Sequence, residues 1–173
     1  ERGLPIGGID LIPIIETALG ISNLARICRS GTRVKCLAFG AGDFTLDMGM
    51  VWTRSEAELL PHRAACVMES RAAGLEPPMD TVWADLRDQE GFIASAKHAA
   101  ALGFQGKMCI HPDQVQPTNA AFSPDEATVA RAKLVVASFD EAEAKGLASI
   151  QLEGQLSDVP SVQRVRSGLA ARR

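Results

Sequence analysis

Four short apolar runs recur along the chain, and a segment with helical periodicity follows each of the first three. The runs cover residues 11–15, 34–39, 80–84 and 107–110. Runs this short and this continuously apolar are typical of strands buried on both faces, as in a parallel sheet. Because helices connect consecutive parallel strands, the alternation predicts an α/β protein whose four strands are parallel and adjacent in chain order.

The helices between these runs are marked by residues that start and stop helices. We expect a first helix over residues 18–29, a second from Pro61 to Gly74 and a third over residues 91–102. Proline is favoured in the first helical turn, and glycine is favoured just after the last one. Residues 43–49 are predicted to form a loop between the second strand and the Pro61 helix.

The pattern changes near residue 123. Ser123-Pro124-Asp125-Glu126 combines a capping box with a proline at the first helical position, and it predicts a long amphipathic helix that reaches Ala144. A polar, glycine-containing stretch over residues 152–160 then precedes a terminal helix from about Ser161. We therefore predict two domains, residues 1–122 and residues 123–173.

Two carboxylates follow the first two apolar runs. Glu16 comes directly after the first run, and Asp43 comes a few residues after Phe39, where the second run ends. The carboxyl ends of parallel strands meet at one edge, where α/β proteins place ligands and metals. Mg²⁺ prefers oxygen ligands and commonly takes one or two protein carboxylates. Either residue alone could instead cap the following helix, but together they favour a magnesium site.

Composition excludes several classes of protein. The 173 residues carry a formal charge of −3 and 46% hydrophobic residues, which is typical of a soluble globular protein. No uninterrupted apolar stretch is long enough for a membrane span, and the first eight residues do not form a secretory leader. Basic residues gather only in a short C-terminal cluster, too local to indicate nucleic-acid binding: Arg164, Arg166, Arg172 and Arg173.

Cysteine usage bears on the cellular compartment. The four cysteines are widely spaced, form no Cys-x-x-Cys pair and lie in apolar segments, where free thiols pack as small hydrophobic groups: Cys28, Cys36, Cys66 and Cys109. Free thiols fit a reducing environment, so we expect a cytoplasmic protein.

Several motifs, taken in order, carry a resemblance to a known family. They are Ile15-Glu16-Thr17-Ala18-Leu19-Gly20, Phe39-Gly40-Ala41-Gly42-Asp43-Phe44-Thr45, Asp80-Thr81-Val82-Trp83-Ala84-Asp85, Cys109-Ile110-His111-Pro112-Asp113-Gln114 and Gly154-Gln155-Leu156-Ser157-Asp158-Val159-Pro160. With these motifs the chain resembles the HpcH/HpaI aldolase and citrate lyase superfamily, and within it the citrate lyase β-subunit-like proteins. Several motifs in the right order are a stronger signal than any one of them.

The resemblance implies a fold. Proteins of this family are (β/α)₈ TIM barrels, often trimeric, that bind Mg²⁺. Residues 1–122 would then be the second half of the barrel, strands five to eight, and residues 123–173 a helical C-terminal extension with a lid. Four strands cannot close a parallel barrel, which needs eight and usually about 250 residues. We therefore expect the N-terminal half of the barrel to precede Glu1.

The resemblance also implies roles for three residues. Glu16 and Asp43 match the two metal-ligand carboxylates of the family, in agreement with their positions at the strand ends. Asp158 matches a catalytic acidic residue of the lid that reaches the active site of a neighbouring subunit. The residues alone favour another interpretation of Asp158, a helix cap before Pro160. The arginine that stands beside the metal in the family has no counterpart in this chain.

Further polar residues follow the third and fourth runs. Histidine is a common proton-transfer residue, but because Pro112 follows His111 we expect His111 to shape the pocket through backbone and packing rather than to transfer protons. Asp85, Asp88 and Glu90 could face the pocket, or they could solvate a turn and start the next helix. The second interpretation is favoured.

These features predict a magnesium-dependent carbon–carbon lyase. Its substrate would be a 3-hydroxyacyl-CoA thioester of malyl, citramalyl or citryl type, and its products acetyl-CoA or a related acyl-CoA and an oxo acid. Two alternatives stay open: a class II aldolase that acts on a free oxo acid without CoA, and a non-catalytic accessory subunit. The resemblance also implies a homo-oligomer, a trimer or a multiple of one.

Overall fold

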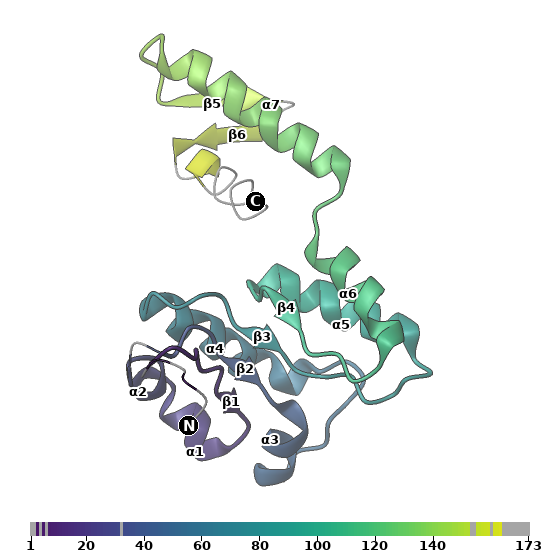
Figure 1. The fold of residues 1–173 in the computed structure, drawn as a ribbon. Coiled ribbons are helices and arrows are strands. Elements are labelled where there is room, and N and C mark those ends of the chain that lie inside the picture. Colours follow the sequence, from purple (N-terminus) through teal and green to yellow (C-terminus); the bar gives the residue numbers. More distant parts are fainter. Residues whose placement is uncertain are drawn as a thin grey trace. The chain divides into compact units, whose positions relative to one another are not determined.

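The computed structural model describes residues 3, 5, 7–31, 33–152, 155–159 and 161–163. These residues fall into two compact units, one within residues 1–123 and the other within residues 124–173 (Figure 1). The first unit contains a parallel sheet with its helices, and the second contains a long helix and a hairpin.

The first unit is built on a four-stranded sheet. Its strands are β1 (Ile14–Ile15), β2 (Ala38–Phe39), β3 (Met79–Asp80) and β4 (Gly106–Lys107). They are parallel and adjacent in the order β1-β2-β3-β4, which confirms the sequence prediction of an α/β protein with a parallel sheet. An isolated parallel bridge between Leu11 and Val34 extends the first pairing.

The strands are shorter than the apolar runs because side chains take over the hydrogen bonding beyond them. After β3, the Thr81 hydroxyl accepts a hydrogen bond from the backbone N–H of Ala41 at 2.9 Å. The backbone oxygen of Trp83 accepts one from the Gln114 side chain at 3.0 Å. Residues 81–84 therefore make no strand pairing and form a loop at the carboxyl end of the sheet.

The helices of the first unit are α1 (Ala18–Ser22), α2 (Leu24–Cys28), α3 (Ala41–Asp47), α4 (Leu60–Ala72), α5 (Gln89–Leu102) and α6 (Val115–Phe122). Short 3₁₀ turns, η1 (Ala57–Leu59) and η2 (Pro112–Gln114), lead into α4 and α6. As expected, α4 has a proline in its first turn, and α5 ends at Gly103, whose φ of 104° is in the left-handed region that favours glycine.

Two local predictions were wrong, and one helix was missed. The single helix expected over residues 18–29 is divided at Asn23, whose side chain donates a hydrogen bond to the Leu19 oxygen at 2.8 Å. The loop expected over residues 43–49 is largely α3, because Phe44 is fully buried and its ring packs on Phe39 with centroids 5.6 Å apart. The free energy gained by packing this helix face outweighs the low helix propensity of the nearby glycines. Helix α6 was not predicted.

A hydrophobic core joins the sheet to α2, α3 and α4. Its buried members include Ile15, Leu24, Leu37, Phe39, Phe44, Leu59 and Cys66. The free thiols of Cys28, Cys36 and Cys66 are buried as expected, but Cys109 is exposed, so that part of the cysteine prediction was wrong. Cys109 follows β4, where the chain has left the sheet.

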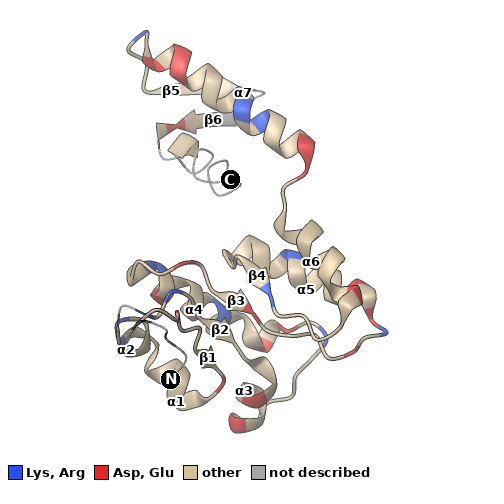
Figure 2. Cartoon of the chain, viewed as in Figure 1, with Lys and Arg blue, Asp and Glu red and all other residues tan. Residues whose placement is uncertain are grey.

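A charged network lies inside the first unit and ties α4 to β3 and β4, whose charged positions are visible in Figure 2. Arg63 of α4 forms a bidentate ion pair with Asp80 of β3, at 2.8 and 3.0 Å. Lys107 of β4 contacts the same carboxylate at 2.7 Å, and Glu56 contacts Arg63 at 2.9 Å. Two buried cations are thus balanced by two buried carboxylates, which is the condition under which buried charge is tolerated.

The second unit contains α7 (Glu126–Glu143), β5 (Ser149–Leu152) and β6 (Gln155–Asp158). Helix α7 begins after Asp125, whose carboxylate accepts a hydrogen bond from the Thr128 N–H at 2.6 Å. Strands β5 and β6 form an antiparallel pair, with Ser149 opposite Asp158 and Leu152 opposite Gln155. The helix packs against β5.

No strand was predicted in this part of the chain, where the described residues 149–152 and 155–158 form a hairpin. Polar and apolar residues alternate along β5, which is the period of a strand with one face covered, and α7 packs against that strand. Residues 161–163 are helical, as expected from Ser161 onwards. Glu153, Gly154, Pro160 and the C-terminal arginine cluster lie outside the described residues.

None of the described helices is long and apolar enough to cross a lipid bilayer.

Candidate functional site

The structure carries both predicted metal ligands to the carboxyl ends of adjacent strands. Glu16 directly follows β1, and Gly40 directly follows β2. The Gly40 N–H donates a hydrogen bond to the Ile15 oxygen at 2.9 Å, so the two strand ends are held together. Gly40 also precedes α3, whose first turn contains Asp43. The two carboxylates therefore belong to neighbouring turns at one edge of the sheet.

Close packing at this edge depends on a glycine. A Cβ added to Gly40 would lie 2.8 Å from the Cβ of Glu16 and 3.0 Å from its Oε2. The Glu16 side chain thus occupies the space that any other residue at position 40 would fill. Glu16 is half-buried and Asp43 is exposed, so the site is open to solvent on one side.

Other residues perform the capping roles that Glu16 might have had. The hydroxyl of Thr17 accepts a hydrogen bond from the Gly20 N–H at 3.0 Å, and Asp47 accepts one from the Ala18 N–H at 2.7 Å. The side-chain carboxylates of Glu16 and Asp43 form no hydrogen bond or ion pair with any residue that the structure describes. Their oxygen lone pairs are therefore available to a ligand.

This donor set fits Mg²⁺ with open coordination positions. Within the described part of the chain, no group of three or more acidic, histidine or cysteine side chains could hold a metal ion by itself. Mg²⁺ does not need such a cage, because it usually keeps several waters and binds through one or two carboxylates together with substrate oxygens. Glu16 and Asp43 would supply those two carboxylates.

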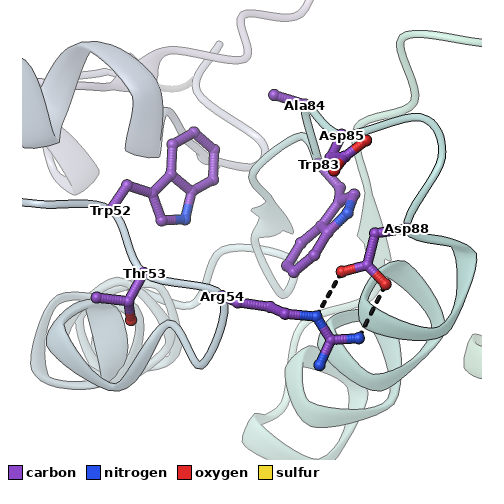
Figure 3. A pocket seen from close by; sticks show the side chains of 7 residues that line it. All are labelled: Trp52, Thr53, Arg54, Trp83, Ala84, Asp85 and Asp88. Atoms are coloured by element: carbon purple, nitrogen blue, oxygen red, sulfur yellow. Dashed lines mark hydrogen bonds and ion pairs between the residues drawn. The ribbon is translucent and has the colours of Figure 1, made fainter.

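A pocket adjoins the turn that carries Asp43. It has a volume of about 290 Å³ and is lined by Trp52, Thr53, Arg54, Trp83, Ala84, Asp85 and Asp88 (Figure 3). A Cβ added to Gly42 would lie 3.8 Å from Cζ3 of Trp52, so the Trp52 ring reaches the first turn of α3. The pocket and the carboxylate pair therefore share one edge of the sheet.

The acidic residues after β3 hold the turn and begin α5. The Asp88 carboxylate accepts hydrogen bonds from Arg54 at 2.6 and 2.8 Å and from the Gly91 N–H at 3.0 Å. The hydrogen bond from Arg54 is the main cause that lowers the pKa of Asp88 below its ordinary value. Asp85 accepts a hydrogen bond from the Arg87 N–H at 3.0 Å, and Glu90 lies in the first turn of α5. These contacts agree with the interpretation that the three acidic residues stabilise a turn and start the next helix.

His111 lies at the start of η2. Its Nδ1 accepts a hydrogen bond from the Asp113 N–H at 3.2 Å, so the side chain holds the local backbone. It also lines a second cavity, of about 300 Å³, together with residues that include Asp85 and Gln114. We still predict that His111 shapes this pocket.

Asp158 is the last residue of β6 in the second unit. Its Oδ1 accepts hydrogen bonds from the Ser161 N–H at 3.0 Å and from the Ser161 hydroxyl at 2.6 Å. These are the contacts of a helix N-cap. Asp158 is exposed to solvent.

The sequence interpretation missed the residues that give the pocket its character. Trp52, Arg54 and Trp83 come from two separate segments, and no spacing rule links them. The composition offered one signal that could have pointed to these residues. The chain contains only two tryptophans and no tyrosine, so each tryptophan is a rare large aromatic side chain. Both tryptophans follow strand and helix ends at the edge that carries Glu16 and Asp43.

A parallel α/β unit with two carboxylates at adjacent strand ends is an arrangement that can hold a divalent metal ion. The family model described as HpcH/HpaI aldolase/citrate lyase matches residues 2–112. The chain belongs to the HpcH/HpaI aldolase/citrate lyase family.

Individual relatives carry lyase names. The chain is 36% identical over 166 residues to the citrate lyase subunit beta of Leuconostoc mesenteroides subsp. cremoris, covering 96% of this chain and 55% of that one. It is 34% identical over 173 residues to the L-malyl-CoA/beta-methylmalyl-CoA lyase of Rhodobacter capsulatus, covering 90% and 54%. The chain thus spans about half the length of the relatives it matches.

A solved structure is similar as well. The crystal structure of CitE from Mycobacterium tuberculosis, in complex with magnesium, acetoacetate and coenzyme A, matches with a TM-score of 0.78 and 27% identity. The match covers 93% of this chain and 60% of that one.

Proposed function

We propose that this chain forms part of a magnesium-dependent carbon–carbon lyase that cleaves or forms a 3-hydroxyacyl-CoA thioester. The observation that carries the proposal is the pair of unpartnered carboxylates, Glu16 and Asp43, at the ends of adjacent parallel strands. Similarity to CitE, solved with magnesium, an oxo acid and coenzyme A, supports it. The acyl group is expected to be of malyl, citramalyl or citryl type.

Glu16 and Asp43 would hold the ion in this enzyme. When bound, Mg²⁺ supplies a Lewis acid that stabilises negative charge on the oxygen of the hydroxy acid or oxo acid. The carboxylates fix its position from two neighbouring turns, and the exposed side of Asp43 leaves room for the substrate. Neither residue needs to transfer a proton in this role.

Asp158 would exchange the proton in the reaction. In the cleavage direction, the hydroxyl proton would pass to solvent water, the oxo-acid carbonyl would form as the adjacent carbon–carbon bond breaks, and the electron pair of that bond would be left on a thioester enolate. The Asp158 carboxyl group would donate a proton to the enolate carbon, and in the condensation direction it would remove that proton. We expect it to act on the site of a neighbouring subunit, so the proposal includes a homo-oligomer.

We further propose that residues 1–122 supply strands five to eight of a TIM barrel and that residues 123–173 form the extension with the lid. The sheet has two strand edges, β1 and β4, that pair with no other described strand. Apolar side chains beside these edges are half exposed, with Ile12 and Ile14 at 51% and Ile110 at 53%. Exposed parallel edges with such side chains require cover, which four further strands would provide.

Calorimetry tests the proposed function. Mg²⁺ should bind in the presence of acetoacetate, and Glu16→Ala or Asp43→Ala should each abolish that binding because half of the protein ligand set is lost. Asp10→Ala, which removes an exposed carboxylate elsewhere, is the matched control and should bind as the parent does. Retained Mg²⁺ binding in both Glu16→Ala and Asp43→Ala would overturn the proposal.

The same method separates the substrate classes. Binding of both coenzyme A and the oxo acid is expected for a lyase that acts on thioesters. Binding of the oxo acid without any binding of coenzyme A would instead indicate an aldolase for free oxo acids. Absence of turnover with intact binding of all ligands would indicate an accessory subunit.

A further inference from the structure

The turn between β2 and α3 is held from both sides by two consecutive backbone N–H groups. The Gly40 N–H donates to the Ile15 oxygen at the end of β1, at 2.9 Å. The next N–H, that of Ala41, lies towards β3 on the other side of β2 and donates to the Thr81 hydroxyl, also at 2.9 Å. Because Ala41 is the first residue of α3, the Thr81 hydroxyl fixes the start of this helix.

The Thr81 hydroxyl takes the place of a helix cap. The residue before α3 is Gly40, which has no side chain to accept a hydrogen bond from the first N–H groups of the helix. Ala41 and Thr81 both have 0% of their surface exposed, so water does not reach this contact. A buried N–H without an acceptor is strongly disfavoured, so the start of α3 should shift if the hydroxyl is removed.

Thr81 is held firmly because the residue before it belongs to the buried charged network. Asp80 pairs with Arg63 at 2.8 Å and with Lys107 at 2.7 Å, and its side chain is fully buried. The network therefore ties the end of β3 to α4 and β4 directly beside Thr81. An acceptor on such a fixed backbone defines the position of its donor closely.

The position of Asp43 depends on the start of α3. Asp43 lies two residues after Ala41, in the first turn of the helix. The Thr45 hydroxyl bonds the Ala41 and Gly42 oxygens at 2.8 and 2.9 Å, so this turn should move as one piece. A metal ligand must be held within about half an ångström, so even a small shift of the turn should change metal affinity.

These contacts extend the metal site to a third strand. We propose that Thr81 is a positioning residue for the Mg²⁺ site, which acts through the Ala41 N–H on the Asp43 carboxylate. The strands β1 and β2 lead to the two ligands, and β3 leads to the side chain that supports one of them. The inference rests on the proposed function, because Asp43 needs exact placement only if it binds the ion.

Calorimetry of two Thr81 variants measures the role of the hydroxyl. Thr81→Val keeps nearly the same shape but lacks the acceptor, and Mg²⁺ should bind roughly tenfold more weakly in the presence of acetoacetate, as is usual for groups that orient metal ligands. Thr81→Ser keeps the hydroxyl and should bind Mg²⁺ as the parent does. Parent-like Mg²⁺ affinity in a folded Thr81→Val protein, or equally weak binding in both variants, would overturn the proposal.

Thr118→Val is the matched control for a purely structural effect. Thr118 is also buried in the first unit, and its hydroxyl donates to the Gln114 oxygen at 2.7 Å. Thermal unfolding should show reduced stability in both valine variants, because both lose a buried hydrogen bond. Mg²⁺ affinity should fall in Thr81→Val only. An equal fall in Thr118→Val would show that reduced stability, rather than the position of α3, weakens the site.

Amide hydrogen exchange, followed by NMR without metal, tests the contact itself. The Ala41 N–H should be protected in the parent and in Thr81→Ser, and it should exchange faster in Thr81→Val. Unchanged protection of Ala41 in a folded Thr81→Val protein would contradict the proposal. If Thr81→Val does not fold, Thr81→Cys replaces it, because a thiol is only a weak acceptor, and the same two measurements decide.

The two proposals fail in different ways. If the parent protein does not bind Mg²⁺ with acetoacetate, the metal site and the positioning role of Thr81 are both wrong. If the parent binds Mg²⁺ and a folded Thr81→Val protein binds it equally well, only the role of Thr81 is wrong and the metal site stands. Neither outcome depends on turnover.

Discussion

The side chain of Glu16 lies against the backbone of Gly40, and no larger residue fits between them. An added Cβ at position 40 would approach the Glu16 Cβ to 2.8 Å and Oε2 to 3.0 Å. The residue that follows β2 therefore sets the position of the carboxylate that follows β1.

This contact predicts the effect of Gly40→Ala. The new methyl group should displace the Glu16 carboxylate and weaken Mg²⁺ binding by roughly tenfold or more, because a metal ligand must be held within about half an ångström. Gly31→Ala is the matched control, since an added Cβ there meets nothing within 4 Å. Calorimetry with Mg²⁺ and acetoacetate measures both. Equal Mg²⁺ affinities of the Gly40→Ala and Gly31→Ala proteins would show that Mg²⁺ binding does not depend on the position that Gly40 gives to the Glu16 carboxylate.

Asp158→Asn separates the catalytic role of Asp158 from its capping role. Asparagine caps helices about as well as aspartate, so the contacts with Ser161 can be kept. We expect turnover to fall roughly a hundredfold or more, with Mg²⁺ affinity nearly unchanged, because proton transfer is lost from an otherwise intact site. Steady-state kinetics measures turnover, and calorimetry measures Mg²⁺ affinity. Unchanged turnover would leave Asp158 as a helix cap alone.

Mixing variants tests whether Asp158 acts between subunits. Asp158→Asn and Glu16→Ala proteins should each be inactive, but mixed oligomers should regain part of the activity. The reason is that some of them pair an intact metal site with an intact Asp158 from the neighbouring chain. A mixture as inactive as its components, with subunit exchange shown by native mass spectrometry, would contradict action between subunits.

The buried network predicts a loss of stability in Arg63→Met. The change leaves Glu56 and Asp80 with fewer counter-charges in the interior, and breaking a buried pair costs about 3–5 kcal/mol. Denaturant-induced unfolding measures the loss in the free energy of unfolding. Arg71→Met, at an exposed position of the same helix, should change stability by less than about 0.5 kcal/mol. Similar losses in both variants would show that the network contributes little.

The ion pair at the pocket rim predicts a pH dependence. Because Arg54 lowers the pKa of Asp88 in the folded state, the pair stabilises the protein above the ordinary aspartate pKa, about 3.9, and this contribution is lost as the pH falls through the lowered value. In Arg54→Met the pKa of Asp88 should return towards its ordinary value. NMR titration of the carboxyl carbon measures this. An unchanged pKa would show that the ion pair is not formed in solution.

The sheet was predictable from sequence because its signal is local. Each strand lies within or directly beside one apolar run, and parallel connections through helices fix the order of the strands. Glu16 and Asp43 could be selected for the same reason, since the end of a run marks the end of a strand. Their individual positions depend on Gly40, which sequence pattern alone did not identify.

The parts that were missed depend on contacts between distant segments. The residues around Phe44 were predicted as a loop, yet they form α3 because Phe44 packs on Phe39. Arg63, Asp80 and Lys107 are ordinary charged residues one by one, and only the fold brings them together. The pocket likewise combines residues 52–54 with residues 83–88. No local pattern connects such segments.

A crystal structure of the protein with Mg²⁺ and an oxo acid tests the central claim most directly. If Glu16 and Asp43 form the metal site, one oxygen of each carboxylate should lie about 2.0–2.1 Å from a single ion, with water and oxo-acid oxygens in the other positions. An ion bound elsewhere, with Glu16 and Asp43 sharing no ligand, would contradict the account.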